Sequence, residues 1–474
     1  MKPKIILTLL ATIFAISSWA QEVDGIYYQI FGNGTATVMP AEYNYRNNQN
    51  LYTGYVMIPD EVVYNGEKYT VTRIGQNAFD SSTSLTAVRL PAGLTGILSN
   101  AFRNCPNLKT LYVGTKTVTA SLIENIGVGS RYPALEEIVI EESVDTIYDH
   151  AFSPYGNTLK RVTINSNAVV SAEYSYGGSL VSRFGFPKNN NNFYVSGTPV
   201  EQFILGEGIE TIGNRAFCGS TGRGDSFDGE YNASVCFTSI TLPKTLKRIG
   251  NMAFWHCNHL QTLSIPASVE SIGENVFDGC CALTHIEVED GNTHYDSRSG
   301  CNAIIETATN TLLRGCQSTT IPTSVTAIGN YAFDWCQGLS TIILPEHITL
   351  IGEGAFYGCL DLKDIYCSHS DPSAYNCQAG TYGLYRMFEL VPKENVTLHV
   401  PAGCGDAYRA LEPWSDFGTI VEDFEPTAIN LVRSDGTKPD AYYNLQGQRI
   451  ANPQRGQIVI IRYSDGTSRK VLMK

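Results

Sequence analysis

Long apolar runs are absent from this chain of 474 residues once its first twenty are passed. Residues 1–20 have a basic start, an apolar stretch from Ile5 to Ile16, and a small-x-small cleavage pattern at Ser18-Trp19-Ala20, as a secretory signal peptide has. The apolar stretch is too short to span a bilayer. We therefore predict an exported chain without a transmembrane segment in its mature form, at the cell surface or outside the cell, with the periplasm as an alternative.

Charged residues are scarce, at 17%, and 46 acidic residues outnumber 33 basic ones, which gives a formal net charge of −13. Such a surface repels a phosphate backbone, so nucleic acid is excluded as a partner. Hydrophobic residues make up 43% of the chain. That share is typical of a folded chain and not of a disordered one.

Catalytic motifs are also missing. The sequence has no nucleophile elbow, no His-Glu-x-x-His pattern and no phosphate-binding loop. The Gly-x-Gly patterns at Gly32 and Gly127 lack the third glycine and the strand-to-helix context of a dinucleotide site. We therefore predict that the protein is not an enzyme and needs no cofactor.

A metal site is not predicted either. His256, Cys257 and His259 could supply ligands, but the residues that align with both histidines in other repeats vary, which indicates an exposed surface rather than a tetrahedral site. Asp225, Asp228 and Glu230 are too sparse for a calcium loop.

What the chain does contain is a repeat of 23 residues, seen most fully in 257–280 as CNHLQTLSIPASVESIGENVFDGC. A period of this length predicts stacked coils. Each Leu-x-x-Ile-x-Leu segment predicts a strand paired in parallel with its copies, and the Pro that follows ends the strand because it lacks an N–H. The repeat phenylalanine recurs at Phe79, Phe102, Phe152, Phe217, Phe254, Phe277, Phe333 and Phe356.

Two smaller features of the repeat also carry predictions. An Ile-Gly pair follows the strand, and we expect its glycine to form a corner with positive φ before an Ala-Phe pair on a helical turn. Cysteines three residues after the phenylalanine are expected to be buried thiols and not disulfides. They are Cys105, Cys257, Cys280, Cys336 and Cys359.

The sequence divides into four parts on this basis. Residues 1–20 form the signal peptide, 21–65 an N-terminal β cap, 66–424 the solenoid with its C-terminal cap, and 425–474 a small β module with alternating apolar residues. The predicted fold class is an α/β repeat solenoid dominated by β-structure, with a ladder of parallel strands.

Three interruptions of the repeat are candidate binding regions. Residues 165–199 are polar and aromatic and form either a degenerate coil or a protruding loop. Their aromatic rings could stack on glycans, although tyrosine is also common in the loops of secreted β-proteins. The aromatic residues are Tyr174, Tyr176, Phe184 and Phe186.

The second interruption, residues 289–318, reads as a hairpin around the turn Thr-Ala-Thr-Asn. A turn centred between Ala308 and Thr309 would place Ile304 opposite Leu313. It would also place Cys301 opposite Cys316, at a separation compatible with a disulfide.

The third interruption, residues 218–236, contains Arg223-Gly224-Asp225-Ser226 and is bounded by Cys218 and Cys236. A Cys218–Cys236 bridge would present the motif in a closed loop of reduced entropy. We hypothesise that the loop binds integrin-type receptors through Arg223 and Asp225. The alternative is chance, since an Arg-Gly-Asp triplet occurs in about one chain in ten of this size.

The repeat resembles the BspA-like leucine-rich repeat family of bacterial surface proteins over most of residues 66–366. That resemblance implies a right-handed leucine-rich-repeat solenoid that mediates adhesion to host extracellular matrix, host cells or other bacteria, without catalysis. The partner would be a matrix or cell-surface protein, and we expect a monomer. The alternative function is a glycan-binding scaffold in carbohydrate capture.

The tail, with Tyr443-Asn444-Leu445-Gln446-Gly447-Gln448-Arg449 and a final Lys-Val-Leu-Met-Lys, is similar to the C-terminal sorting domains of type IX secreted proteins. It departs from their pattern in an extended section from Ile458 to Ser468.

Overall fold

Short strands make up most of the secondary structure, and the helices are few and brief. The computed structural model describes residues 20–474 apart from 42–51, 127–132, 153–154, 156–157, 175–178, 185–199, 220–236, 379–385, 425–438, 452, 455–456, 464–467 and 473–474. The chain divides into two compact units, Met1–Leu159 and Lys160–Lys474. Both contain stacked coils joined by parallel strands, which confirms the predicted β-dominated repeat solenoid.

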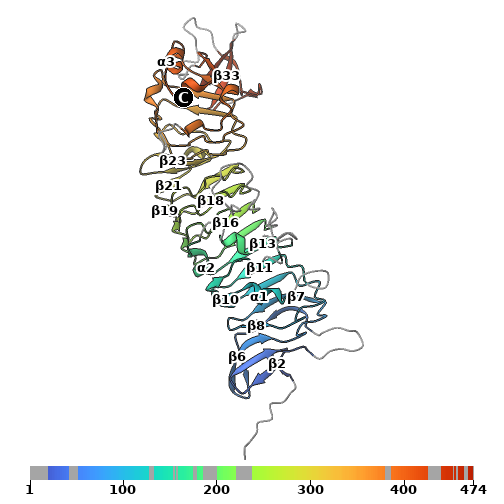
Figure 1. The fold of residues 1–474 in the computed structure, drawn as a ribbon. Helices are drawn as coiled ribbons and strands as arrows, with labels where there is room; N and C mark the ends of the chain where they lie inside the picture. Colours follow the sequence, from blue (N-terminus) through green and yellow to red (C-terminus); the bar gives the residue numbers. More distant parts are fainter. Residues whose placement is uncertain are drawn as a thin grey trace, which may run out of the picture. The chain divides into compact units, whose positions relative to one another are not determined.

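Unit 1 begins with a sheet in the order β1-β2-β3-β6-β5, with β8 added beside β6 (Figure 1). Pairing is antiparallel except that β3 and β8 run parallel to β6. Tyr28, Ala36 and Val38 are buried, as expected for strands that cover the first coil. The strands are β1 Gln21–Val23, β2 Ile26–Phe31, β3 Thr35–Val38, β5 Glu61–Tyr64, β6 Glu67–Ile74 and β8 Gly96–Ile97.

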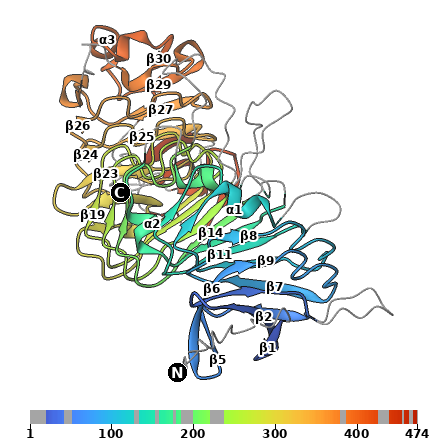
Figure 2. The same cartoon turned by 60° about the horizontal axis from the view of Figure 1, so that its bottom comes forward.

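The parallel ladder of unit 1 runs β4-β7-β9-β11, and Figure 2 shows β7, β9 and β11 in sequence. Its strand β7 ends at Leu90, directly before Pro91, as predicted. The ladder strands are β4 Gly54–Met57, β7 Leu85–Leu90, β9 Thr110–Val113 and β11 Glu137–Ile140. The unit also contains strands β10 Thr117–Val118 and β12 Thr146–Ile147, which pair with each other, and helix α1 Ala120–Glu124.

Unit 2 continues the same architecture with several parallel ladders. One ladder consists of β13 Arg161–Ile164, β14 Gln202–Leu205, β16 Ser239–Thr241, β18 Thr262–Ile265 and β20 His285–Val288; a later one consists of β25 Thr341–Leu344, β27 Asp364–Cys367, β29 Thr397–His399 and β30 Thr419–Val421. Short strands at the Ile-Gly corners pair between coils: β15 Thr211–Ile212, β17 Arg248–Ile249, β19 Ser271–Ile272, β24 Ala327–Ile328 and β26 Leu350–Ile351. Strand β28 Asn376–Cys377, which lacks an Ile-Gly pair, lies beside β26 in the same row.

Helical structure in the described part of unit 2 is limited to single turns or little more. The α-helices are α2 Asn167–Ser171 and α3 Gly405–Arg409. The 3-10 helices are η2 Leu180–Arg183, η3 Arg298–Gly300, η4 Pro372–Ala374, η5 Arg386–Phe388, η6 Lys393–Asn395 and η7 Trp414–Asp416.

The repeat phenylalanines stack on one another in the centre of the coils. The Phe254 and Phe277 rings lie 5.8 Å apart and within 3° of parallel, and Phe333 stacks on Phe356 at 5.3 Å. Their side chains are at most 5% exposed, and replacing one with Ala would cost about 3–5 kcal/mol. The stack continues to Phe388, 5.4 Å from Phe356, in a coil that the sequence pattern did not reveal.

The five repeat cysteines are buried free thiols, which confirms the prediction for them. The structure adds a reason for cysteine at this position. The thiols of Cys105 and Cys359 each lie 3.0 Å from the carbonyl oxygen of a phenylalanine in an earlier coil, Phe79 and Phe333 respectively, and donate a hydrogen bond to it. A side chain of this size fills the space and also provides a donor to a buried carbonyl.

The prediction for the Ile-Gly corner was wrong. The glycines there, such as Gly213 and Gly250, do not have positive φ; instead the adjacent coil leaves no room for a side chain. A Cβ on Gly250 would lie 2.7 Å from the backbone nitrogen of Asn214. Positive φ occurs two residues later, for example at Met252.

The Ala-Phe pair also differs from the predicted helical turn. Residues with left-handed backbone lie on both sides of it, such as Asn77 and Ser81 around Ala78-Phe79, with φ of 57° and 61°. Consecutive tight turns therefore replace the helix, with Ala78 N–H bonded to Gly75 O and Ser82 N–H to Phe79 O.

The C-terminal residues form an antiparallel sheet in the order β32-β31-β33-β34. It packs on the outward side chain of Tyr366 on β27, where Phe424 and Ile458 complete a buried cluster with Ile343 and Leu445 at its edge. Lys470 Nζ donates to the Tyr366 hydroxyl at 3.3 Å. The strands are β31 Pro439–Tyr443, β32 Arg449–Ile450, β33 Ile458–Tyr463 and β34 Ser468–Leu472.

Candidate functional site

The Arg223-Gly224-Asp225-Ser226 motif and Cys236 lie outside the described residues. Cys218, which precedes them, is a buried free thiol, and burial raises its pKa to about 11. The Cys218–Cys236 bridge stays a prediction.

The described part of residues 165–199 is a degenerate coil. Its helix α2 is capped by Ser166, whose hydroxyl accepts from Val169 N–H, and Leu180 N–H bonds to Ala216 O in the following coil. Tyr174 and Phe184 are buried, so stacking of these two rings on a glycan is ruled out. Tyr176 and Phe186 lie outside the described residues.

The predicted hairpin in residues 289–318 is present, as β22 Ala303–Glu306 and β23 Thr311–Gly315, with β21 Tyr295–Asp296 paired to β22. The predicted register was wrong: a bulge lies between Ile304 and Ile305, and Ile304 pairs with Arg314 instead of Leu313. Cys301 and Cys316 are buried free thiols in this structure. Their disulfide stays a prediction.

The sequence predicted that His256 is exposed, because the residues aligned with it vary between copies of the repeat. That prediction was wrong. Burial lowers the pKa of its imidazole to about 4, and a Cβ on Gly279 of the next coil would lie 2.9 Å from its Nδ1. Among the described residues, no group of three or more His, Cys, Asp or Glu side chains could hold a metal ion.

A buried ion pair that sequence reasoning missed lies beneath the hairpin. Arg314 Nη1 is 2.6 Å from Asp334 Oδ1, with both side chains at most 7% exposed. The same guanidinium donates to the carbonyls of Cys280 and Tyr331, and Asp334 accepts from Gly279 N–H. The one signal in the sequence was an arginine within the otherwise apolar strand Thr-Leu-Leu-Arg-Gly.

Asp278 lies next to this pair. Burial raises the pKa of its carboxyl to about 8, and the negative charge of Asp334 adds to the rise while Arg314 opposes it. These groups are buried and link three coils. We assign them a structural role.

The candidate recognition surface is on the outer face of the unit 1 ladder. Tyr55 and Met57 on β4 are 46% and 59% exposed. The Tyr55 ring lies 5.2 Å from the ring of Tyr112 on β9, and burial together with Tyr112 raises the pKa of the Tyr55 hydroxyl. Met57 pairs with Arg89, and Arg89 pairs with Tyr112, so the side chains share one face. We call Tyr55, Met57, Arg89 and Tyr112 the ladder-face patch.

Arg89 is fixed in place at the centre of this patch. Its guanidinium binds Glu141 at 2.8 Å and Asp60 at 3.0 Å, and donates to the Ile58 carbonyl. The side chain is only 14% exposed. The patch is therefore a rigid aromatic and apolar surface with carboxylates at its edge.

The outward apolar residues of the later ladder are covered, unlike those of the ladder-face patch. Ile343 and Tyr366 occupy outward positions on β25 and β27, and the C-terminal sheet covers them. Within the described part of unit 1, Tyr55 and Met57 have no such cover. An apolar face of this kind that stays open is typical of a surface that binds another molecule.

These features define a leucine-rich-repeat solenoid with an exposed ladder face and no catalytic constellation among the described residues. The family model of the BspA type leucine rich repeat region, in six copies, matches residues 67–121, 118–223, 228–314 and 304–378. Because these matches cover more than half of the chain, the chain belongs to this family. No curated protein matches the chain significantly.

Solved structures with the same type of repeat cover most of the chain. A leucine rich cell surface protein from Faecalibacterium prausnitzii A2-165 is 19% identical with a TM-score of 0.36, covering 85% of this chain and 94% of its own. A leucine-rich repeat protein from Bacteroides ovatus ATCC 8483 is 18% identical with a TM-score of 0.30, covering 85% and 99%. The structure contains no helix long and apolar enough to cross a membrane among its described residues.

Proposed function

We propose that the protein is exported to the cell surface and binds a protein partner through the ladder-face patch. The partner class is a host extracellular-matrix protein, a host cell-surface protein or a surface protein of another bacterium. The observation that carries the proposal is the exposure of Tyr55 and Met57 on a rigid parallel ladder.

The composition of the patch supports a protein partner. Tyrosine, methionine and arginine are enriched in protein interfaces, and tyrosine and arginine often carry most of the binding energy. The Tyr55–Tyr112 pair and the fixed Arg89 lose little conformational entropy on binding because neighbouring groups already hold them.

The test is binding of the whole protein to immobilised matrix proteins and to intact cells. The double variant Tyr55→Ser with Met57→Ser should weaken binding at least about tenfold, since each exposed apolar anchor is worth 1 kcal/mol or more. Tyr148→Ser is the matched control, because Tyr148 is also in unit 1 and is 56% exposed. Equal effects of the two variants would contradict the proposal.

The glycan-binding alternative makes a different prediction. If carbohydrate capture is the function, the protein should bind a glycan array and not immobilised protein. Loss of cell binding after deglycosylation of the cells, with matrix-protein binding absent, would favour that alternative over the ladder-face patch.

Two further proposals rest on the sequence. The Arg223-Gly224-Asp225-Ser226 segment would bind integrin-type receptors, and unchanged cell adhesion of the Asp225→Glu variant would contradict this. The C-terminal β module would act in sorting across the outer membrane. Removing residues 425–474 should then leave the protein inside the cell envelope, as fractionation would show.

A further inference from the structure

The C-terminal sheet has an apolar cluster of its own, separate from its contact with the coils. Among the described residues, this cluster contains only side chains of the sheet: Val459, Ile461, Tyr463, Tyr442 and Ile450. The cluster that joins the sheet to the coils is small and has three buried members, Tyr366, Phe424 and Ile458. The sheet can therefore separate from the coils and keep its own packing.

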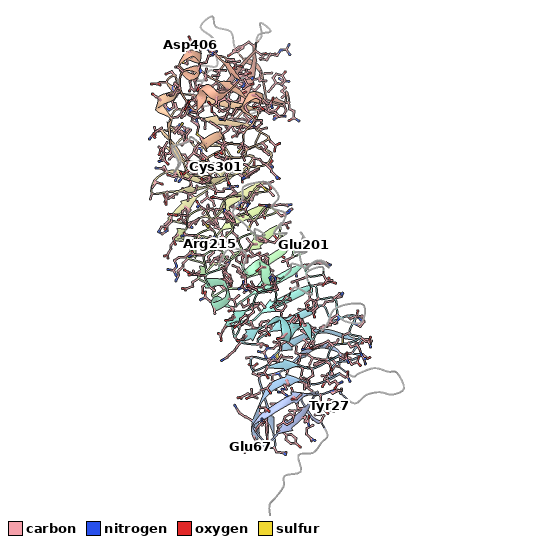
Figure 3. All side chains as sticks on the ribbon, in the orientation of Figure 1. Tyr27, Glu67, Glu201, Arg215, Cys301 and Asp406 are labelled. Carbon is pink, nitrogen blue, oxygen red and sulfur yellow. The ribbon has the colours of Figure 1, made fainter. Side chains whose placement is uncertain are left out.

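A buried histidine lies beneath this contact. The His399 ring on β29 stacks on the Tyr366 ring at 4.2 Å and within 9° of parallel, and its side chain is 5% exposed. Strand β29 belongs to the last coil, which continues through α3, where Figure 3 labels Asp406, to β30. His399 thus supports the tyrosine on which the C-terminal sheet packs.

Both ring nitrogens of His399 face carboxylate oxygens. Nδ1 lies 2.6 Å from Asp423 Oδ1, and Nε2 lies 3.1 Å from Asp364 Oδ1. An ionised carboxylate only accepts hydrogen bonds, and a neutral imidazole has only one N–H to donate. Both contacts are hydrogen bonds only when the imidazole carries two protons and a positive charge. We call Asp364, His399 and Asp423 the histidine bridge.

The histidine bridge holds the chain where it leaves the coils for the C-terminal sheet. Asp423 is followed by Phe424, whose ring lies 5.2 Å from that of Tyr366. Lys470 Nζ lies 3.9 Å from Asp423 Oδ2, which is too far for a hydrogen bond, so Lys470 does not replace the imidazole as a donor. The titratable groups that contact His399 or its partners are Asp364 and Tyr366 on β27, Asp423 after β30, and Lys470 on β34.

We propose that the histidine bridge is a pH-sensitive latch for the C-terminal sheet. With two protons, His399 bonds both carboxylates and keeps Asp423 and Phe424 in place beside Tyr366. Loss of one proton leaves a ring nitrogen with a lone pair facing a carboxylate, and the repulsion loosens the contact.

The direction of the pH effect follows from the proton count. The docked sheet requires both protons on His399 and the released sheet does not, so docking weakens as the pH rises. Release would uncover Ile343 and Tyr366, the outward apolar residues of the later ladder. The latch is separate from the ladder-face patch and does not depend on it.

The test is hydroxyl-radical footprinting of the whole protein at about pH 5.5 and about pH 8.5, which lie on either side of the range where histidine usually changes charge. Tyr366 is 1% exposed and becomes open to oxidation when the sheet leaves. Tyr375, 2% exposed in the interior of the coils, is the internal reference.

The oxidation rate of Tyr366 relative to Tyr375 should rise about tenfold at the higher pH, the effect of losing one hydrogen bond between charged groups. The internal reference removes any change in the stability of the coils with pH. A ratio that is equal at the two pH values would overturn the proposal.

Two variants test the bridge itself. In Asp364→Asn the amide can donate to Nε2 while a neutral imidazole donates from Nδ1 to Asp423, so the ratio at the higher pH should stay within about twofold of its value at the lower pH. His399→Gln removes the titrating group, so its ratio should not change with pH. Asp364 is 36% exposed, so its variant tests the latch even where a change at the buried His399 prevents folding.

Asp416→Asn is the matched control. It removes another partly exposed carboxylate of the last coil, which bonds Lys393 Nζ at 2.6 Å, and it should keep the full rise with pH. A full rise in Asp364→Asn or His399→Gln would show that another group controls the sheet and would overturn the proposal. Loss of the rise in Asp416→Asn would assign it to the overall charge of the coil and would overturn the proposal as well.

Discussion

The indole of Trp335 lies against Gly358 of the next coil so closely that a Cβ on Gly358 would come within 2.7 Å of its Cδ2. Both residues have left-handed backbone, with φ of 49° and 65°. The pairs Tyr331 with Gly354 and His256 with Gly279 repeat this arrangement. In each pair, a large side chain in one coil lies against a glycine at the same repeat position in the next coil. The residues that vary between copies of the repeat are therefore matched in size from one coil to the next.

Gly358→Ala should lower the free energy of unfolding by about 2–5 kcal/mol. The left-handed backbone costs a non-glycine residue about 1–2 kcal/mol, and the overlap with Trp335 adds about 1–3 kcal/mol. Denaturant unfolding would measure the loss. In a Trp335→Ala background only the backbone part should remain, so an equal loss in both backgrounds would contradict the contact.

Gly250→Ala should also destabilise the protein, by about 1–3 kcal/mol, but for a different reason. Gly250 does not have positive φ, and the loss comes from the overlap of the added Cβ with the backbone nitrogen of Asn214, 2.7 Å away. Gly32→Ala is the control, since nothing lies within 4 Å of its Cβ position and its φ is not positive either. It should change the free energy of unfolding by less than about 0.5 kcal/mol.

Asp278 should make the protein less stable as the pH rises. Its pKa in the folded state is about 8, above the value of 3.8 for an unfolded chain, so between these values the folded state binds more protons. Stability then falls from about pH 4 to about pH 8. Asp278→Asn should therefore stabilise the protein above about pH 8 and have little effect near pH 4.

Unfolding midpoints of the two proteins across this pH range would test the effect of Asp278. Asp290→Asn removes an exposed carboxylate a short distance along the chain and serves as the control. A stabilisation by Asp278→Asn that does not change with pH would show that the carboxyl does not titrate in this range.

Arg314→Met should cost about 3–5 kcal/mol, because it leaves the buried Asp334 carboxylate without its cation. Arg103→Met removes the partner of Asp80 at the equivalent place after another repeat phenylalanine. Arg103 is 38% exposed, so its loss should be about 1 kcal/mol or less. Equal losses in thermal unfolding would mean that burial does not set the strength of the Arg314 pair.

The repeated strands and the central phenylalanines could be predicted because each depends on residues within one copy. Pro91 and Pro266 end their strands whatever lies in the next coil. The role of Gly250 and the position of Phe388 depend on which residue of one coil lies over which residue of another. Interruptions of the repeat shift that relation, and a single sequence does not show by how much.

The candidate site was less predictable for the same reason. Tyr55 and Met57 lie in a strand before the first complete copy of the repeat, where no periodic pattern marks the outer face. The N-terminal sheet of unit 1 depends in the same way on a bulge between Ala36 and Thr37 and on the pairing of Arg73 with Gly96. Neither register is set by local sequence, and the Ile304–Arg314 pairing shows how one bulge alters a hairpin.

The thiol of Cys105, bound to the Phe79 carbonyl, has consequences for how the chain matures. Burial raises its pKa to about 12, so the folded protein offers almost no thiolate at neutral pH and exchanges slowly with other thiols or disulfides. The unfolded chain, by contrast, exposes thirteen cysteines at once. In an oxidising compartment, coil stacking must therefore be faster than thiol oxidation, and the order in which coils assemble determines which cysteines escape incorrect cross-links.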